Sequence, residues 1–302
     1  MKKKIYPNTF LIGVQKAATT SLYHSLSKHP DICAPLAVKD FGFFTKDEFY
    51  VEKGLEYLAS FYDGFYNDEK IILQGSAHYI FFEGAIKRIK EFNPDAKFIL
   101  ILRNPIERAV SSYRFAVKHH METLDFEDAL KEEEIRLQSN NKSVLSELTY
   151  KEHGLYFKQI SNFLKYFKKD QIKIIIYDDL IERPIVEIKN VFEFLNIDLD
   201  YDPELKPLNR TGVLRVKYLE WLIFSKESWF RKLLLKSFKN IITNEEKRYK
   251  IRRFLKETNT KPIKNNSLDD ISDKSKKELI EFYKKDIEKL SDFLNKDLSH
   301  WM

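Results

Sequence analysis

The sequence predicts a three-layer α/β fold, in which a central parallel β-sheet is flanked by helices on both sides. Short apolar runs rich in Ile, Leu and Phe are typical of strands that are buried on both faces, and they occur at residues 9–14, 70–73, 97–102 and 172–177. Helical patterns lie between these runs, at residues 20–28, 83–91, 105–117, 155–167 and 186–195. Because strands that alternate with helices form parallel sheets, we expect the helices to cover both faces of the sheet.

The C-terminal third of the chain has a different pattern. Residues 216–239 are aromatic, basic and helical in period, and residues 272–298 form a long amphipathic helical pattern. The eight glycines and nine prolines are scattered, without a low-complexity linker. We therefore expect a single domain over residues 1–302, with an α/β core at 1–200 and a mostly helical extension of the same domain at 201–302; a separate helical lid is the alternative.

Composition sets broad limits on the chemistry. The formal net charge of +6 suits an anionic ligand, although a lysine-rich surface gives the same value without one. Cys33 is the only cysteine, so no disulfide can form within the chain. The N-terminal sequence MKKKIYPNTFLIGV has too short an apolar run for a signal peptide, and no run approaches the roughly 18 apolar residues that span a bilayer. We expect a cytoplasmic protein.

The first predicted strand runs directly into a loop that suits an anion. Gly13, small residues and Lys16 precede a helix that opens with residues 19–21, Thr-Thr-Ser. The N–H groups at the start of a helix and the positive end of its dipole attract anions. The nucleoside-triphosphate pattern GxxxxGK[ST] is not met, because Gln15 precedes the lysine and Ala17 follows it. The alternative is a tight strand-to-helix turn with a solvated lysine.

This segment, GVQKAATTSLYHSLSKHPDI at residues 13–32, resembles the 5'-phosphosulfate-binding loop of the sulfotransferases that use 3'-phosphoadenylyl sulfate (PAPS). It is most similar to the heparan-sulfate-type and bacterial branch, whose loop reads roughly GVxKxGTTSLxxxLxxHPxI. The resemblance implies a P-loop-like fold and a donor site. It assigns the 5'-phosphosulfate to Lys16 and to the amides of Ala17, Ala18, Thr19, Thr20 and Ser21, with Ala18 standing where a glycine is usual.

A second anion site is predicted where the strand at 97–102 ends in RNPIERAVSSYRF. Asn104 suits a helix N-cap, Pro105 suits the first helical position, and Arg103 stands at the carboxyl end of the strand, where ligands of open α/β sheets bind. The same family carries the motif LRxPxxRxxSxY, which this segment matches. The resemblance assigns Arg103 and Ser111 to the 3'-phosphate of PAPS. The alternative is an arginine in a structural ion pair and a serine at a helix surface.

The acceptor side is predicted from the segment AVKDFGFFT at residues 37–45. The branch usually has KExxFF here, and its glutamate is taken to be the general base. Asp40 occupies that position, and the resemblance places Lys39 and Phe43 near the acceptor. We expect the aromatic residues behind Asp40 to desolvate it and to raise its pKa. The alternative is a loop aspartate that pairs with Lys39.

Two further residues are weaker candidates for the site. His78 in LQGSAHYIFF is the rival base, in a segment where Gln74 and Gly75 replace residues usual in the branch. Arg215, or Arg210, lies roughly where the family has a basic loop that closes over the cofactor, and the alternative is a plain connecting loop. The histidines have no metal-ligand spacing, so we predict no metal site.

The expected reaction is in-line transfer of a sulfuryl group from PAPS to a hydroxyl or amine, which releases adenosine 3',5'-bisphosphate. We expect Lys16 to stabilise the leaving oxygen without a metal and Asp40 to deprotonate the acceptor, which is a glycan, a lipid or a small molecule. The alternatives are a P-loop kinase-like phosphotransferase and a non-catalytic nucleotide-binding or membrane-surface protein. Peripheral membrane contact is suggested by residues 221–239. No motif points to nucleic acid or to an oligomeric state.

Overall fold

The computed structural model describes residues 4–205, 212–214, 260–262 and 271–302. Contacts divide the chain into two compact units, residues 1–208 with 267–302, and residues 209–266. In the second unit, β6 (Gly212–Leu214) pairs with β7 (Thr260–Pro262) in antiparallel fashion. The predicted helical pattern at 216–239 lies outside the described residues. So do Arg210 and Arg215, the two candidates for the basic loop. The expectation of one domain over the whole chain stays a prediction.

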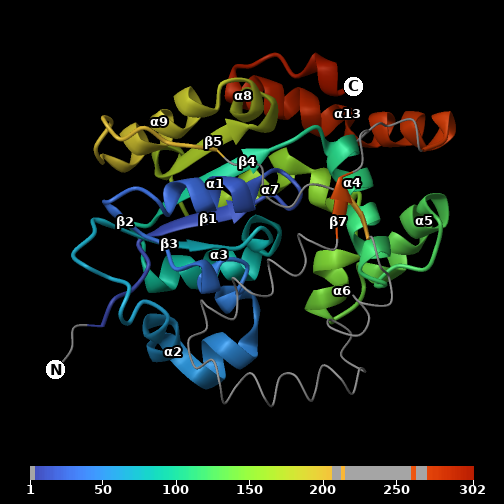
Figure 1. Cartoon of the computed structure of the whole chain (residues 1–302). Coiled ribbons are helices and arrows are strands. Elements are labelled where there is room, and N and C mark those ends of the chain that lie inside the picture. Colours follow the sequence, from blue (N-terminus) through green and yellow to red (C-terminus); the bar gives the residue numbers. More distant parts are fainter. Residues whose placement is uncertain (1–3, 206–211, 215–259, 263–270) are drawn as a thin grey trace. The chain divides into compact units, whose positions relative to one another are not determined.

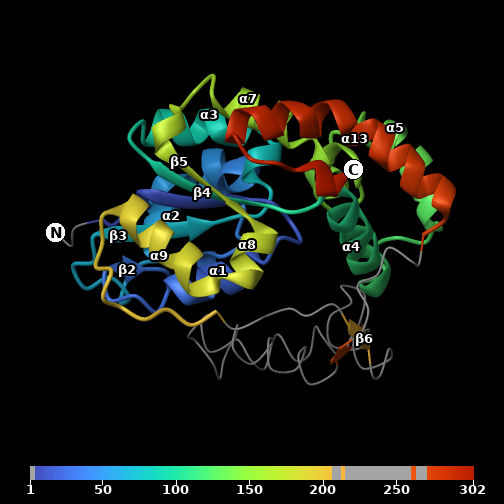
Figure 2. The same ribbon diagram turned by 90° about the horizontal axis from the view of Figure 1, so that it is seen from above.

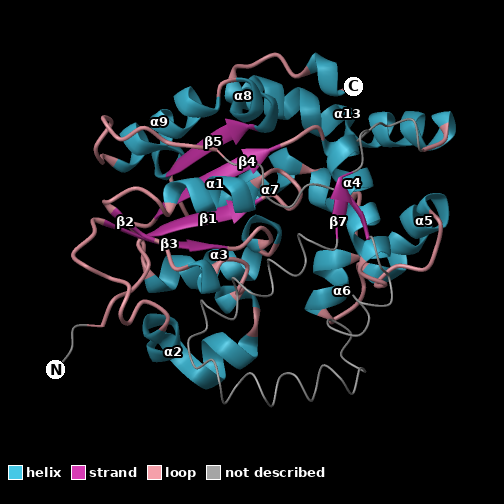
Figure 3. Ribbon diagram, in the orientation of Figure 1, coloured by secondary structure: helices cyan, strands magenta, loops and turns pink. Residues whose placement is uncertain are grey.

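The described part of the first unit contains a five-stranded sheet in the order β2-β3-β1-β4-β5, and every neighbouring pair is parallel. Figure 3 shows these strands side by side. The predicted parallel sheet is confirmed, with one short strand added at its edge. The strands are β1 (Thr9–Gly13), β2 (Ile32–Cys33), β3 (Ile71–Gly75), β4 (Lys97–Leu102) and β5 (Ile172–Ile176).

Helices cover both faces of this sheet, as predicted (Figure 2). One layer contains α1 (Thr19–Leu26), α8 (Tyr177–Glu182) and α9 (Pro184–Leu195). The other contains α3 (Glu83–Phe92), α7 (Tyr156–Phe163) and α13 (Asp273–Leu294). The remaining helices are α2 (Gly54–Ser60), α4 (Pro105–Lys118), α5 (Phe126–Arg136) and α6 (Lys142–Glu147), and shorter helical turns lie at Leu36–Val38, Phe43–Thr45, Glu48–Lys53, Tyr79–Phe81, Glu152–Gly154, Lys169–Gln171 and Ser299–Trp301.

The core lies on both sides of the central strands. Phe10 of β1 and Phe98 of β4 are completely buried, and their rings stack with centroids 5.8 Å apart. Phe98 also contacts Phe163 of α7, with centroids 4.9 Å apart, so the sheet and the helical layer share one core. Burial of each such side chain contributes about 1.5–3 kcal/mol. The core therefore fixes the carboxyl ends of β1 and β4 relative to each other.

Two helices, α4 and α13, begin with the caps that their residues favour. The Asn104 side chain accepts hydrogen bonds from the N–H groups of Ile106 and Glu107, at 3.0 and 3.3 Å, and Pro105 is the first residue of α4. Ser272 caps α13, the predicted C-terminal amphipathic helix, by accepting from the Ser275 N–H at 3.1 Å. Within the described ranges, no helix combines the length and the apolar character that crossing a membrane would require.

Candidate functional site

The loop between β1 and α1 has the backbone shape of an anion-binding nest. Lys16 and Ala18 both adopt left-handed backbone conformations, with φ of 70° and 59°. Such conformations beside right-handed ones direct neighbouring N–H groups toward a common point. Ala18 is also the N-cap residue of α1, and it supplies no side-chain cap to the N–H groups that open the helix. The predicted anion loop therefore has suitable geometry, although Ala18 takes up a conformation that favours glycine.

Gly13 makes this loop sterically feasible at the end of β1. A Cβ atom at Gly13 would lie only 2.7 Å from Cγ2 of Ile80 and 3.3 Å from Cδ1 of Leu100. The backbone φ of Gly13 is +158°, which side-chain-bearing residues rarely adopt. The close approach of β1 to the turn at Tyr79–Phe81 thus requires glycine at this position.

The two predicted anion sites lie directly beside each other. Nη1 of Arg103 donates to the carbonyl oxygen of Lys16 at 3.2 Å. Its Nε and Nη2 donate to Oε2 of Glu107, at 3.1 and 2.7 Å, and its guanidinium lies over the ring of Tyr177. Figure 1 shows β1 and β4 both ending toward α4, the helix that follows Arg103. The structural ion pair considered from the sequence is present, and it coexists with the contact between the two sites.

Helix α4 contacts the same loop through one of its two consecutive serines. Ser111 is buried, so the alternative of a serine at the helix surface is wrong. The next residue, Ser112, donates to Oε1 of Gln15 at 2.7 Å. Lys16 Nζ lies 4.5 Å from the ring centroid of Phe115, one turn further along this helix. Helix α4 therefore contacts two consecutive residues of the loop, Gln15 and Lys16.

Asp40 is held at the carboxyl end of β3, close to the end of β1. Its N–H donates to the Gly75 carbonyl oxygen at 2.7 Å, and its Oδ1 accepts from the Ala77 N–H at 3.0 Å and from Lys39 Nζ at 2.5 Å. The Lys39 side chain is only 2% exposed, whereas that of Asp40 is 48% exposed. The predicted alternative, pairing with Lys39, is thus present.

The expected rise in the pKa of Asp40 is wrong. Burial acts to raise this pKa, but the Lys39 ammonium, the Ala77 N–H and the charge of His78 outweigh it, so the pKa is lowered. The sequence offered pairing with Lys39 as the alternative, but it could not decide whether the Lys39 ammonium or burial would dominate the pKa of Asp40. The structure also places Phe43 in the core, where it is completely buried and its ring packs against that of Phe44. Phe43 therefore offers no exposed surface to an acceptor.

His78 and Asp40, the two candidate bases, lie close enough for their charges to interact. Nε2 of His78 is 3.6 Å from Oε1 of Glu147, and its buried Nδ1 has no hydrogen-bond partner among the residues that the structure describes. The ring of His153 lies beside that of His78, with centroids 5.8 Å apart. Burial lowers the pKa of His153 well below its usual range, and Arg108 and His78 add to this effect, so His153 is neutral.

Glu147 is a site residue that sequence reasoning missed. It is the last residue of α6, and its Oε2 accepts from Gln15 Nε2 at 2.9 Å. Burial acts to raise the pKa of Glu147, but contacts with His78 and Gln15 outweigh it and lower that pKa. Gln15 and Glu147 are 132 positions apart in the chain, so no motif spacing joins them. Only the folded chain brings them together.

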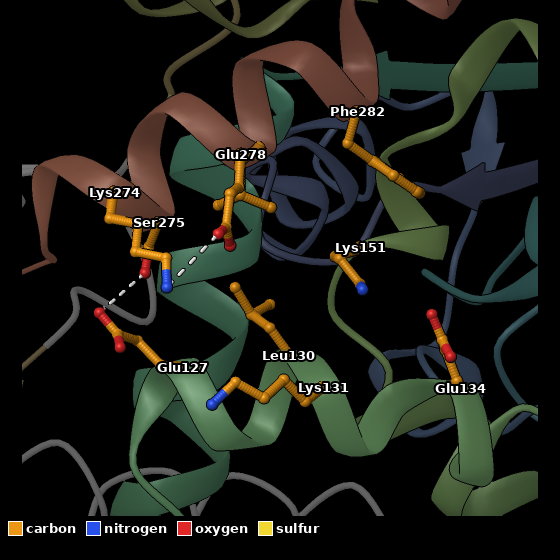
Figure 4. A pocket seen from close by; sticks show the side chains of 10 residues that line it. Glu127, Leu130, Lys131, Glu134, Lys151, Lys274, Ser275, Glu278 and Phe282 are labelled. Carbon is orange, nitrogen blue, oxygen red and sulfur yellow. Dashed lines mark hydrogen bonds and ion pairs between the residues drawn. The ribbon is translucent and has the colours of Figure 1, made fainter.

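A cavity of about 380 Å³ lies elsewhere, between α5 and the first half of α13 (Figure 4). Its charged lining consists of three lysines and three glutamates, so it carries no net charge that would select an anion. None of the described candidate site residues lines it. The lining residues are Glu127, Leu130, Lys131, Glu134, Lys151, Lys274, Ser275, Glu278, Leu279 and Phe282.

Comparisons with known proteins agree with this geometry. Residues 6–262 match the family described as "Sulfotransferase domain". Heparan sulfate glucosamine 3-O-sulfotransferase 5 of Mus musculus is 29% identical over 191 residues, which are 63% of this chain and 54% of that protein. The bifunctional heparan sulfate N-deacetylase/N-sulfotransferase 1 of Caenorhabditis briggsae is 26% identical over 211 residues, 65% of this chain and 23% of that protein.

The crystal structure of a sulfotransferase from Alicyclobacillus acidocaldarius superimposes with a TM-score of 0.69 at 23% identity, and covers 98% of this chain and 99% of that one. This similarity shows a shared fold and confirms the predicted three-layer architecture. The chain spans about half the length of the 3-O-sulfotransferase that it matches.

Proposed function

Because the chain belongs to the sulfotransferase domain family, we propose that it transfers a sulfuryl group from PAPS to a hydroxyl or amine of an acceptor and releases adenosine 3',5'-bisphosphate. The observation that carries this proposal is the hydrogen bond from Arg103 to the Lys16 carbonyl oxygen. It joins the two anion sites that a nucleotide with phosphate groups at both its 3' and 5' positions needs.

The residues present fit such a donor. Lys16 and the N–H groups at the start of α1 suit the 5'-phosphosulfate, since a left-handed nest and a helix N-terminus both attract anions. Arg103 has five N–H donors, and its bonds to Glu107 and Lys16 use three of them. Two N–H groups remain for a 3'-phosphate, to which we also assign Ser111.

We assign the proton transfer to Asp40. Its lowered pKa keeps the carboxyl ionised near neutral pH, so it can accept the proton of the acceptor. Oδ1 is already engaged by Lys39 and Ala77, which leaves Oδ2 for the acceptor. As the acceptor oxygen or nitrogen bonds to sulfur, the bond from sulfur to the leaving phosphate oxygen breaks, and Lys16 stabilises the charge on that oxygen.

The acceptor class is proposed to be a saccharide. Relatives that match this chain carry names that specify heparan sulfate or its glucosamine. A transfer screen with ³⁵S-labelled PAPS should therefore include glucosamine-containing oligosaccharides, lipids and phenols as separate arms. Transfer to the oligosaccharides supports the class, and transfer to another arm alone would replace it.

Calorimetry tests the donor independently of the acceptor. We expect adenosine 3',5'-bisphosphate to bind in the absence of metal, and ATP with Mg²⁺ to bind more weakly. Tight binding of ATP with Mg²⁺ and none of the bisphosphate would favour a kinase-like phosphotransferase and would overturn the proposal.

A further inference from the structure

Glu147 is placed between the two halves of the site, and the proposed reaction does not use it. One oxygen, Oε2, accepts from Gln15, which precedes Lys16 in the donor-binding loop. The other, Oε1, faces Nε2 of His78 at 3.6 Å, on the acceptor side. The charge of Asp40 also reaches Glu147, since it acts against ionisation of that carboxyl. A single carboxylate therefore contacts residues from both sides.

We propose that Glu147 is a positioning residue that couples the donor-binding loop to the acceptor-activating residues, acting through Gln15 and His78. The inference rests on the proposed sulfotransferase activity and deepens it. The Gln15 amide is fixed from two directions, by Ser112 on its oxygen and by Glu147 on its nitrogen. Loss of the contact with Glu147 leaves the Gln15 side chain, next to Lys16, held by Ser112 alone.

Local helix stability does not explain this placement. A carboxylate in the last position of a helix is opposed by the negative end of the helix dipole. Glu147 ends α6 with its side chain only 28% exposed. Its favourable contacts lie outside the helix, in the candidate site.

The chain that follows Glu147 is clamped by two buried charges. Glu133, completely buried, accepts from the N–H groups of Tyr150, Lys151 and Glu152, each at 2.7 Å. Arg108, also completely buried, donates to the Tyr150 carbonyl oxygen. Because this clamp begins three residues after Glu147, the end of α6 is held against the site. A rigid support of this kind is what positioning of reacting groups requires.

On the acceptor side, Glu147 orients His78. Among the described residues, the buried Nδ1 of His78 has no hydrogen-bond partner, and the other ring nitrogen, Nε2, faces Glu147. The contact with Glu147 therefore fixes the orientation of the His78 ring. His78 directly follows Ala77, whose N–H donates to Oδ1 of Asp40 at 3.0 Å, so the position of His78 bears on the residue that activates the acceptor. Removal of the Glu147 charge should therefore disturb acceptor activation, even where the donor loop stays in place.

Two substitutions separate these contacts. Glu147→Gln keeps an oxygen for Gln15 but removes the charge that faces His78, so we expect kcat to fall about tenfold or more, as misplacement of reacting groups produces, with the Kd of adenosine 3',5'-bisphosphate within about twofold of wild type. Glu147→Ala removes both contacts, and we expect it to weaken bisphosphate binding as well. Glu83→Gln is the matched control, because Glu83 pairs with Lys165 outside the site.

A double-mutant cycle excludes a general loss of stability. We expect Glu147→Gln and His78→Asn to be non-additive in kcat, since each breaks the same contact. Additive losses, or a Glu147→Gln enzyme with wild-type kcat, would overturn the positioning role. Absence of transfer by the wild-type chain with PAPS would overturn the proposed function instead. Glu147→Gln is nearly isosteric, so it keeps the test valid if Glu147→Ala does not fold.

Discussion

The donor side and the acceptor side of the site are built in different ways. The donor side consists of two strand-to-helix junctions, residues 13–21 and 102–111, which offer backbone N–H groups together with the side chains of Lys16, Arg103 and Ser111. The acceptor side brings together Asp40, His78 and Glu147, which come from three separate segments and interact through their side chains.

This difference predicts how each side responds to mutation. Backbone N–H groups remain when a side chain changes, so the donor side should tolerate substitutions such as the alanine at position 18, provided that the loop conformation is kept. Side-chain networks lose their function when one member is removed. We therefore expect acceptor-side substitutions to reduce turnover and donor-side substitutions to reduce nucleotide affinity.

The largest expected effect is that of Asp40→Asn. An amide cannot accept the acceptor proton, and loss of a general base lowers kcat by about 10²–10⁴-fold. The affinity for adenosine 3',5'-bisphosphate should stay unchanged, because Asp40 belongs to the acceptor side. Steady-state transfer assays and calorimetry measure the two quantities. Asp47→Asn is the control, since Asp47 is a surface partner of Arg88. Unimpaired transfer by Asp40→Asn would move the base role to His78.

The donor side could be predicted from the sequence because each junction is a contiguous motif at the end of a strand. The strand ends are brought together by the parallel sheet, so Lys16 and Arg103 had to meet if the fold was right. The acceptor side could be predicted only in part. Asp40 was found from its motif, but its pKa direction depends on the buried Lys39 ammonium, which the sequence does not place. Glu147 depends on the clamp around Tyr150 and has no motif at all.

A smaller effect, on affinity alone, is expected for Arg103→Lys. Lysine keeps the positive charge but loses the fork that contacts both Glu107 and the Lys16 carbonyl oxygen. A hydrogen bond that involves a charged group is worth about 1.5–3 kcal/mol, so the Kd of adenosine 3',5'-bisphosphate should rise about 10- to 150-fold. Arg183→Lys, at a surface pair with Asp179, is the control. An unchanged Kd would refute the assignment of Arg103 to the nucleotide.

Gly13→Ala tests whether the donor side depends on backbone conformation. The new Cβ would clash with Ile80, and we expect the free energy of unfolding to fall by about 1–3 kcal/mol, the cost of overpacking. Chemical denaturation measures it. Gly84→Ala is the matched control, because nothing lies within 4 Å of a Cβ there and alanine favours the helix by up to about 1 kcal/mol. Equal free energies of unfolding for the two variants would show that the loop accommodates a Cβ atom at position 13 without loss of stability.

The smallest expected effect is that of pH on the wild-type enzyme. The pKa of Asp40 is lowered, because Lys39 and Ala77 outweigh the effect of burial. An ordinary aspartate has a pKa of about 3.9, so Asp40 should stay ionised between about pH 5 and 7. Its titration should therefore cause little change in kcat/KM over this range. The stability from its pairing is present above the unfolded pKa and is lost as the pH falls through the folded one. Thermal unfolding of wild type and Asp40→Asn should therefore converge below about pH 4. An acid limb of kcat/KM between about pH 5 and 7 would instead assign proton acceptance to a group other than Asp40, and the acceptor side would then need another base.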